Sequence, residues 1–382
     1  MTSAAAEAVS SRRRRILLVF AIQGIVLATL NMRIPDLQLR AGLSDAQLGL
    51  ILVGGATGAI ATYPLAAPVI ERFGTRRTIL ATYTLMALAA AGVATFAHGG
   101  AMFAFLLLVG AGSSLSNIAI NVEVDRVEAD TGARLMNRCH GAWSVVFLLA
   151  SSVAGLARGL GVAPVLHLWI EVPVYVAATV VLVMPMRESP PREAATVPKR
   201  RLVVPTAAVL GLVAFALGAD LLEGASRVWA TIYLRDAFDV SPMVESMALP
   251  ALILTMAGVR LVADPWIDRF GPARIARASL TVALAGVALI VFAPWAWVAI
   301  AGFAVAGIGS AVVYPLMVSA AARLGDRPAE ENVAATTLVF QFVLLVSPML
   351  IGFVAEGFGI RAAFGLFLPL LAIGLAMSGR LR

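Results

Sequence analysis

Long apolar runs alternate with short polar segments along the whole chain, and this pattern predicts membrane-spanning helices. A helix needs about 20 mostly apolar residues to cross the hydrocarbon core of a bilayer, and twelve such runs follow one another. We expect spans at 16–35, 46–70, 78–97, 100–122, 139–160, 163–186, 204–226, 243–263, 275–293, 296–320, 333–355 and 360–379. The predicted fold class is an all-α membrane protein with twelve transmembrane helices.

An internal repeat divides the spans into two sets of six. A constant offset of 197 residues aligns Glu71-Arg72-Phe73-Gly74 with Asp268-Arg269-Phe270-Gly271, and it also aligns Gly110 with Gly307. A polar, proline-rich segment separates the two sets. We therefore expect two pseudo-symmetric six-helix bundles that are parallel repeats. The expected boundaries are 1–186 for the N-terminal bundle, 187–203 for a cytoplasmic linker and 204–382 for the C-terminal bundle.

Composition and charge support a membrane protein and assign its orientation. Of 382 residues, 60% are hydrophobic and only 13% are charged, which excludes an ordinary soluble enzyme. The net charge of +7 could suggest a nucleic-acid partner, but 22 of the 29 Lys and Arg residues fall on one side of the predicted spans and six on the other. This distribution follows the positive-inside rule. It predicts cytoplasmic termini and removes the reason to expect nucleic acid.

Two loops carry the motif that relates the chain to a known family. The loop after the second span contains Glu71-Arg72-Phe73-Gly74-Thr75-Arg76-Arg77, and the loop after the eighth contains Asp268-Arg269-Phe270-Gly271. Both loops resemble the G-x-x-x-D-R-x-G-R-R signature of the major facilitator superfamily. The sequence departs from it because Ala67 and Asp264 replace the leading glycine and Glu71 replaces the aspartate.

The resemblance extends over almost the whole chain. Within that family, the sequence is similar to a bacterial inner-membrane branch. It implies a monomeric secondary active transporter, not an enzyme, which works by alternating access around a mid-membrane site. It implies a small-molecule substrate and a lipid bilayer as partners, and no cofactor. Fold does not select the solute.

Asp220 and Glu223 are the candidates for proton coupling, because ionisable residues inside spans are costly and therefore functional by default. They lie at positions i and i+3 on one helix face, and the repeat offset places them at mid-span. Burial of two adjacent carboxyl groups favours a neutral acid that takes up and releases a proton near neutral pH. The alternative is a structural ion pair with Arg227, one turn further along.

Polar and aromatic residues at comparable positions are candidates for substrate binding. Amide groups within spans can bind a solute or join helices to one another. Arg33 can attract an anionic solute, close an outer gate with Asp36, or be an interface charge, and His140 with Trp143 can line the cavity or anchor the interface. The candidate set is Gln23, Asn31, Arg33, Asn117, Asn121, His140, Trp143, Arg227, Tyr314 and Gln341.

The signature loops and their neighbours are candidates for a conformational gate. An acidic residue beside an arginine at a helix end can contact a neighbouring span in one conformation and lose that contact in the other. Arg260 and Asp264, four residues apart, are expected either to form a latch or only to neutralise charge. The set is Glu71, Arg72, Gly74, Arg76, Arg260, Asp264, Asp268, Arg269 and Gly271.

Three functions remain in competition. The leading hypothesis is proton-coupled symport of a small polar or anionic nutrient, and the second is proton-antiport export of drugs or metabolites. A non-transporting membrane sensor is a distant third. No zinc-ligand spacing or hydrolase motif occurs in the sequence, and its three histidines are dispersed, so we expect neither a metal site nor catalytic residues.

Overall fold

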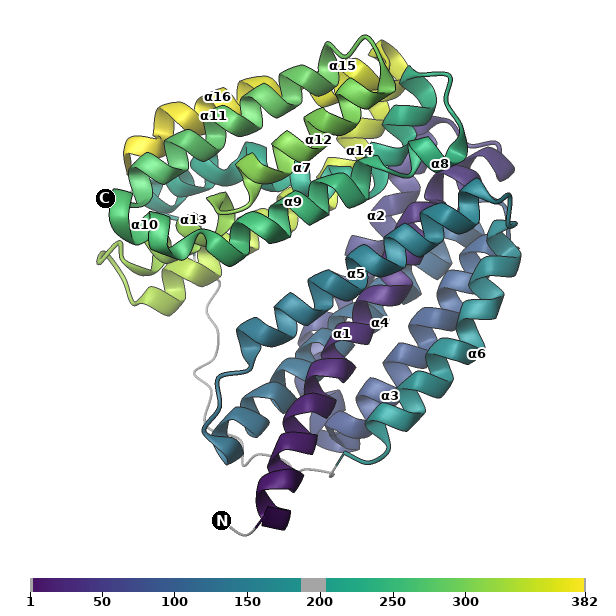
Figure 1. Cartoon of the computed structure of the whole chain (residues 1–382), viewed down its shortest axis with the longest axis vertical. Helices are drawn as coiled ribbons and strands as arrows, with labels where there is room; N and C mark the ends of the chain where they lie inside the picture. The colour runs from purple at the N-terminus through teal and green to yellow at the C-terminus, as the bar shows by residue number, and fades with distance from the viewer. Residues whose placement is uncertain (1–2, 187–203, 381–382) are drawn as a thin grey trace. The chain divides into compact units, whose positions relative to one another are not determined.

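The computed structural model describes residues 3–186 and 204–380, and this part of the chain is helical with short connections and contains no strand (Figure 1). Contacts divide it into two compact units, one within Met1–Leu43 and Ile51–Thr196, the other within Ser44–Leu50 and Val197–Arg382. The predicted linker, 187–203, lies outside the described residues.

The first unit is built from long, nearly uninterrupted helices. They are α1 (Ser3–Arg40), α2 (Asp45–Thr62, of which the first residues group with the second unit), the 3-10 turn Tyr63–Leu65, α3 (Ala66–Thr95), α4 (Gly99–Thr131), α5 (Met136–Gly159) and α6 (Pro164–Val183). Helix α3 packs along α4, and α1 packs along α5.

The second unit contains more helix breaks. Its elements are α7 (Ala207–Ala237), α8 (Pro242–Glu245), α9 (Ala248–Val262), α10 (Asp264–Phe270), α11 (Pro272–Val291), α12 (Ala296–Ser310), α13 (Val313–Ala322), α14 (Ala329–Phe358), α15 (Ile360–Gly365), α16 (Phe367–Met377) and the 3-10 turn Ser378–Arg380. Helix α7 lies among α9, α13, α14 and α16. It is therefore the central helix of this unit.

The number of apolar helical segments agrees with the predicted spans once one long segment is divided. The described residues contain 11 helical segments that are long and apolar enough to cross a membrane, and one of them, Asp45–Thr95, has 51 residues. At 1.5 Å per residue it would be roughly 75 Å long, more than twice the 30 Å hydrocarbon core. Gly74 interrupts it with φ 75° and ψ 162°. The segment therefore supplies two crossings, which gives twelve in total.

The repeat seen in the sequence is also present in helix packing inside each unit. In the first unit, a Cβ atom on Gly110 of α4 would overlap the carbonyl oxygen of Gly55 in α2. In the second unit, a Cβ on Gly307 of α12 would overlap the carbonyl oxygen of Leu252 in α9. Both pairs are related by the same 197-residue offset. Glycine allows the helix backbones to approach this closely.

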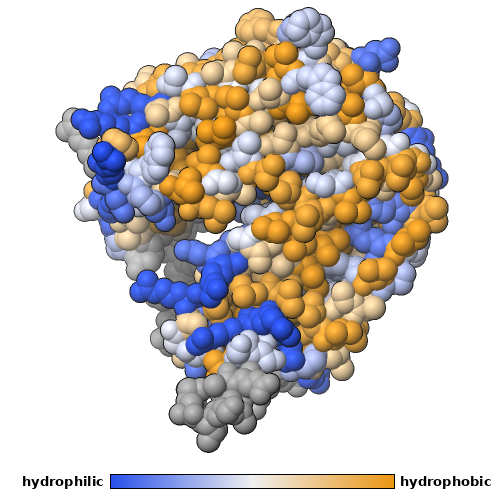
Figure 2. Space-filling view, in the orientation of Figure 1, coloured by the Kyte–Doolittle hydropathy of each residue, from blue (hydrophilic) through white to orange (hydrophobic). Residues whose placement is uncertain are grey.

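Large apolar side chains also cover much of the outside. Figure 2 shows broad apolar areas over the helical surface of the visible face. On α6, Ile170, Val174 and Val181 are 54%, 66% and 70% exposed. Such continuous apolar exposure is unfavourable in water and is typical of helices that face lipid.

Candidate functional site

A cluster of charged side chains lies inside the second unit, where α7 packs against α9. Glu223 of α7 accepts a hydrogen bond from Arg227 Nη2 through Oε1, at 2.8 Å. Its other oxygen, Oε2, accepts one from Arg260 Nη2 at 3.1 Å. One carboxylate thus bridges two guanidinium groups. The predicted ion pair between Arg227 and the acidic residues of α7 forms with Glu223.

Arg260 is held in this cluster by a second contact. Its Nε donates to the carbonyl oxygen of Ala311 at 2.9 Å, at the break between α12 and α13. Among the described residues, these are the contacts that the Arg260 side chain makes, and the latch with Asp264 stays a prediction. Helix α9 ends at Val262 and α10 begins at Asp264 with Pro265 in its first turn. Because the helix is interrupted, the spacing of four residues no longer places the two side chains on one face.

Asp220 lies one turn before Glu223 in a different environment. Its Oδ2 atom is buried and has no hydrogen-bond partner in the structure. The two arginines contact Glu223 instead. A buried carboxylate without a hydrogen bond is costly. The two carboxyl groups that the sequence treats as a pair therefore differ in their contacts, because among the described ion pairs both arginines contact Glu223 and neither contacts Asp220.

Tyr314, a predicted substrate-binding residue, lies close to this cluster. It is on α13, which packs against α7, and it lies within electrostatic range of Asp220 and Glu223. Its ring meets that of Phe340 on α14 edge-on, with centroids 5.6 Å apart.

The amide candidates of the first unit mostly contact their own unit. Gln23 Nε2 donates to Ser116 Oγ at 2.9 Å, which joins α1 to α4. Asn121 Nδ2 donates to Asn117 Oδ1 at 3.1 Å and to the Asn117 carbonyl at 2.7 Å. Asn31 is half-buried, and Gln341 of the second unit is exposed. Of these amides, Gln23 most clearly joins helices.

The aromatic candidates on α5 pack against apolar neighbours. The exposed ring of His140 meets Phe20 edge-on at 4.8 Å between centroids. Trp143 stacks on Phe147 at 5.0 Å. These contacts place both candidates along the interface of α5 with α1 and do not by themselves indicate a ligand.

Arg33 is part of a buried ionic network that joins three helices of the first unit. Its side chain is 1% exposed, and Nη1 pairs with Asp36 at 3.0 Å. Its Nε donates to His167 Nδ1 on α6 at 3.1 Å, and Asp36 also pairs with Arg158 of α5 at 2.6 Å. Since the side chain is buried and paired, Arg33 does not present its charge to solvent in this conformation.

The two signature loops have the same backbone geometry. Gly74 and Gly271 have φ angles of 75° and 81°, which only glycine adopts without strain. The guanidinium of Arg72 lies 5.4 Å from the ring centroid of Phe73, and Arg269 lies 5.2 Å from that of Phe270. The acidic members of the predicted gate are exposed, namely Glu71, Asp264 and Asp268.

Arg76 contacts the cytoplasmic end of the first unit as defined by the predicted topology. Its Nη1 donates to the carbonyl oxygen of Met186 at 3.4 Å, just beyond the end of α6.

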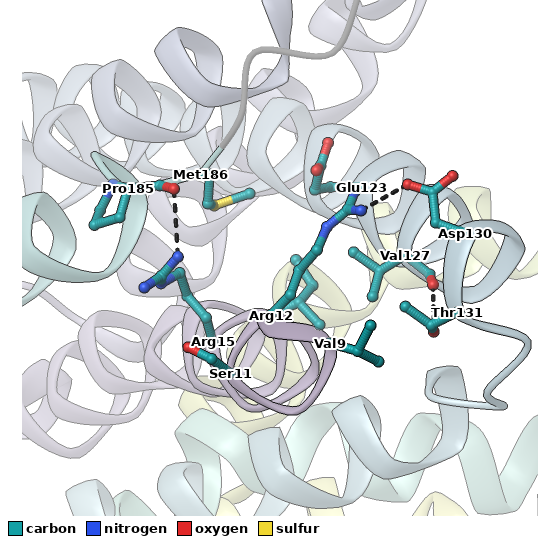
Figure 3. A pocket seen from close by; sticks show the side chains of 11 residues that line it. Val9, Ser11, Arg12, Arg15, Glu123, Val127, Asp130, Thr131, Pro185 and Met186 are labelled. Carbon is teal, nitrogen blue, oxygen red and sulfur yellow. Dashed lines mark hydrogen bonds and ion pairs between the residues drawn. The ribbon is translucent and has the colours of Figure 1, made fainter. Parts of the chain in front are cut away.

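A cavity of about 370 Å³ lies nearby, between the start of α1 and the end of α4. Figure 3 shows Arg12 paired with Asp130, at 2.6 Å, and Arg15 directed to the carbonyl of Pro185. Charges at this cavity are largely engaged in contacts between helices.

Sequence reasoning missed Glu171, a further acidic residue inside a span. It lies on α6, where its Oε1 atom is buried without a hydrogen-bond partner. An acidic residue inside an otherwise apolar span was visible in the sequence and is a sufficient signal to name it as a candidate.

Within residues 3–186 and 204–380, no group of three His, Cys, Asp or Glu side chains could hold a metal ion.

Comparisons with known proteins agree with these observations. The sequence model of the family described as Major Facilitator Superfamily matches residues 16–330 and 212–381. The chain is 28% identical over 367 residues to an uncharacterised transporter, y4wD, of Sinorhizobium fredii, which covers 93% of this chain and 94% of that relative. It is 27% identical over 381 residues to the membrane protein MosC of Rhizobium meliloti, which covers 94% of this chain and 86% of the relative.

Solved structures show the same fold at low sequence identity. The nucleoside transporter NupG, in a mutant form, has a TM-score of 0.73 at 13% identity and covers 98% of this chain and 100% of its own. An inward-facing bacterial homologue of the lysosomal transporter Spinster has a TM-score of 0.77 at 14% identity and covers 98% and 96%. A D-xylose–proton symporter has a TM-score of 0.74 at 15% identity and covers 98% and 97%.

Proposed function

The chain belongs to the major facilitator superfamily of membrane transporters, and on that premise we propose that it carries a small polar solute together with protons. The proposed membrane is the bacterial inner membrane, with both termini in the cytoplasm. Members of this family bind small molecules, are not enzymes and typically work as monomers. Proton coupling and the nature of the solute are proposed from the residues of the site.

The observation that carries the proposal is the Oδ2 atom of Asp220, which is buried beside an ion-pair cluster and has no hydrogen-bond partner. Burial of a charged oxygen without a hydrogen bond is costly, so this environment favours the neutral acid. A conformation that brought water to this group would favour the carboxylate. Asp220 would then take up a proton in one conformation and release it in the other.

Glu223 has a different role in this proposal. Its carboxylate pairs with Arg227 and Arg260 from two helices, so in this conformation its charge is balanced by these arginines while Asp220 changes its charge. Protonation of Asp220 raises the net charge of the cluster by one. A change of charge at a site that two conformations solvate differently shifts their populations. This links proton binding to the exposure of the solute site.

The charged character of the cluster favours uptake of a polar solute over export of an apolar drug. Sites for apolar ligands are lined mainly by apolar and aromatic side chains. Here α7 and α9 present two arginines and two carboxyl groups, with a tyrosine from α13 close by. Proton-coupled symport of a polar nutrient is therefore the function that the site supports best.

Proton movement in proteoliposomes tests the proposal. Purified protein is reconstituted with a pH-sensitive dye inside, and defined sugars, sugar acids, nucleosides and small carboxylates are added outside one at a time. We expect at least one solute to acidify the interior, and we expect Asp220→Asn to abolish that signal while still exchanging the solute across the membrane. Proton movement in Asp220→Asn equal to that of the wild type would refute the role of Asp220, and no response to any solute would count against symport of polar solutes.

A further inference from the structure

We propose that Arg227 and Arg260 form the binding site for a carboxylate group of the solute, which replaces Glu223 between them. The inference rests on the proposed function and names its substrate class: the solute is a small organic anion. Its basis is the position that Glu223 occupies, because one oxygen contacts each guanidinium, at 2.8 Å and 3.1 Å. A free carboxylate has the same two oxygens at the same separation. The side chain of Glu223 is thus an internal stand-in for the ligand.

The charges of the cluster leave room for one further anion. The ion pairs of the cluster join two guanidinium groups to one carboxylate, that of Glu223. A solute that carries a carboxylate brings a second negative charge to these arginines and can form charge-assisted hydrogen bonds with them. A neutral solute of the same size does neither.

The arginines can be reached from outside the unit more easily than the glutamate that they hold. The side chains of Arg260 and Arg227 are 39% and 31% exposed, whereas that of Glu223 is 15% exposed. A carboxylate that approaches this face meets the guanidinium groups first. It can therefore contact both arginines before Glu223 has moved away, which lowers the cost of the exchange.

Arg260 keeps its position when Glu223 is displaced. Its Nε donates to the carbonyl oxygen of Ala311 at 2.9 Å, and this contact does not involve the carboxylate. The Nη2 atom that holds Glu223 is then presented to the incoming anion in the same orientation. Pre-organised donors of this kind lose little conformational entropy on binding. The exchange needs movement of only one short side chain on α7.

Thermal stability of the full chain in detergent, without a proton gradient, tests the inference. The probes are pairs that differ only in charge: lactate with lactamide, gluconate with glucose, and D-xylonate with D-xylose. We expect at least one carboxylate to raise the unfolding temperature more than its uncharged partner, because a ligand that binds only the folded form stabilises it. If no carboxylate does so, the inference is wrong.

Two variants and one control locate the effect. Arg260→Gln should weaken the binding of that carboxylate roughly tenfold or more, since it removes a charge-assisted contact. Glu223→Gln should strengthen the binding, because the internal competitor is lost. Arg323→Gln, an exposed arginine that contacts only Ser319 in its own helical segment, serves as the matched control and should leave the affinity unchanged.

The outcomes separate this inference from the proposed function. Retained affinity in Arg260→Gln, or no gain of affinity in Glu223→Gln, would overturn the carboxylate site. The affinity of Glu223→Gln tests the carboxylate site even if Arg260→Gln does not fold. Because no gradient is present, loss of proton coupling in Asp220→Asn and loss of carboxylate binding in Arg260→Gln are measured independently.

Discussion

Replacing Gly110 by alanine should destabilise the first unit, because the methyl group has no space between α4 and α2. A Cβ at this position would lie 2.7 Å from the carbonyl carbon of Gly55 and would overlap its oxygen, whereas ordinary contacts fall at 3.4–4 Å. The obstacle is backbone, which cannot rotate away as a side chain can. The two helices must therefore separate by roughly 1 Å, which disturbs every contact between them.

The expected magnitude follows from two opposing contributions. Alanine improves helix propensity over glycine by about 1 kcal/mol. Insertion of a methyl group into a packed interface costs about 1–3 kcal/mol, and a clash with backbone belongs at the upper end. We expect a net loss of about 1–2 kcal/mol in the free energy of unfolding.

Thermal unfolding in detergent measures this loss, with Gly141→Ala as the control. Gly141 lies within α5 of the same unit, and a Cβ there meets nothing within 4 Å. The control variant should unfold at the wild-type temperature or slightly above it. Equal unfolding temperatures for Gly110→Ala and Gly141→Ala would refute the packing argument. The repeat predicts the same contrast for Gly307→Ala in the second unit.

Three further predictions concern the loops and the ionic networks. Gly271→Ala should lower stability by about 1 kcal/mol, because alanine is strained at φ 81°, and thermal unfolding should show it; an unchanged transition would mean that the loop relaxes. Arg33→Gln should lower the free energy of unfolding by about 3–5 kcal/mol, the range for breaking a buried ion pair. The refolding yield and the unfolding temperature of this variant should fall together. An effect as small as that of a surface substitution would contradict the burial of Arg33. The pKa of Asp326, outside the spans, is lowered, first of all by the hydrogen bond from Asn332. Its contribution to stability is therefore present above the ordinary carboxyl range and is lost as the pH falls through the lowered value. Asp326→Asn should reduce stability near neutral pH and weaken its acid dependence, and an unchanged acid dependence would refute this assignment.

Sequence alone predicted the fold because its determinants are local. The apolar runs are long enough to identify each span, and the two glycines of the signature loops mark where the backbone takes a positive φ. The breaks inside the second unit were not predicted. Helix α12 ends at Ser310 and α13 begins at Val313 within a single apolar run, so no change of polarity marks the break.

The candidate site was predictable only where one helix supplies it. Asp220, Glu223 and Arg227 share a face of α7 because of their spacing, and the structure brings the last two together. Arg260 was assigned to a local partner, Asp264, whereas it contacts Glu223, 37 residues away in the sequence. Such a pairing depends on how α9 packs against α7, which periodicity does not encode. The contact of Gln23 with Ser116 was not predictable for the same reason.

Infrared difference spectroscopy of the purified full chain tests the central claim most directly, because it observes the protonated carboxyl group itself. Spectra are compared between acidic and alkaline buffer for the wild type, Asp220→Asn and Glu171→Gln, each with its unfolding temperature checked. The account predicts that the wild type has a carboxylic acid carbonyl band that is lost between the acidic and the alkaline buffer, that Asp220→Asn lacks this band, and that Glu171→Gln retains it. A titrating band of the same size in Asp220→Asn would show that the proton is carried elsewhere.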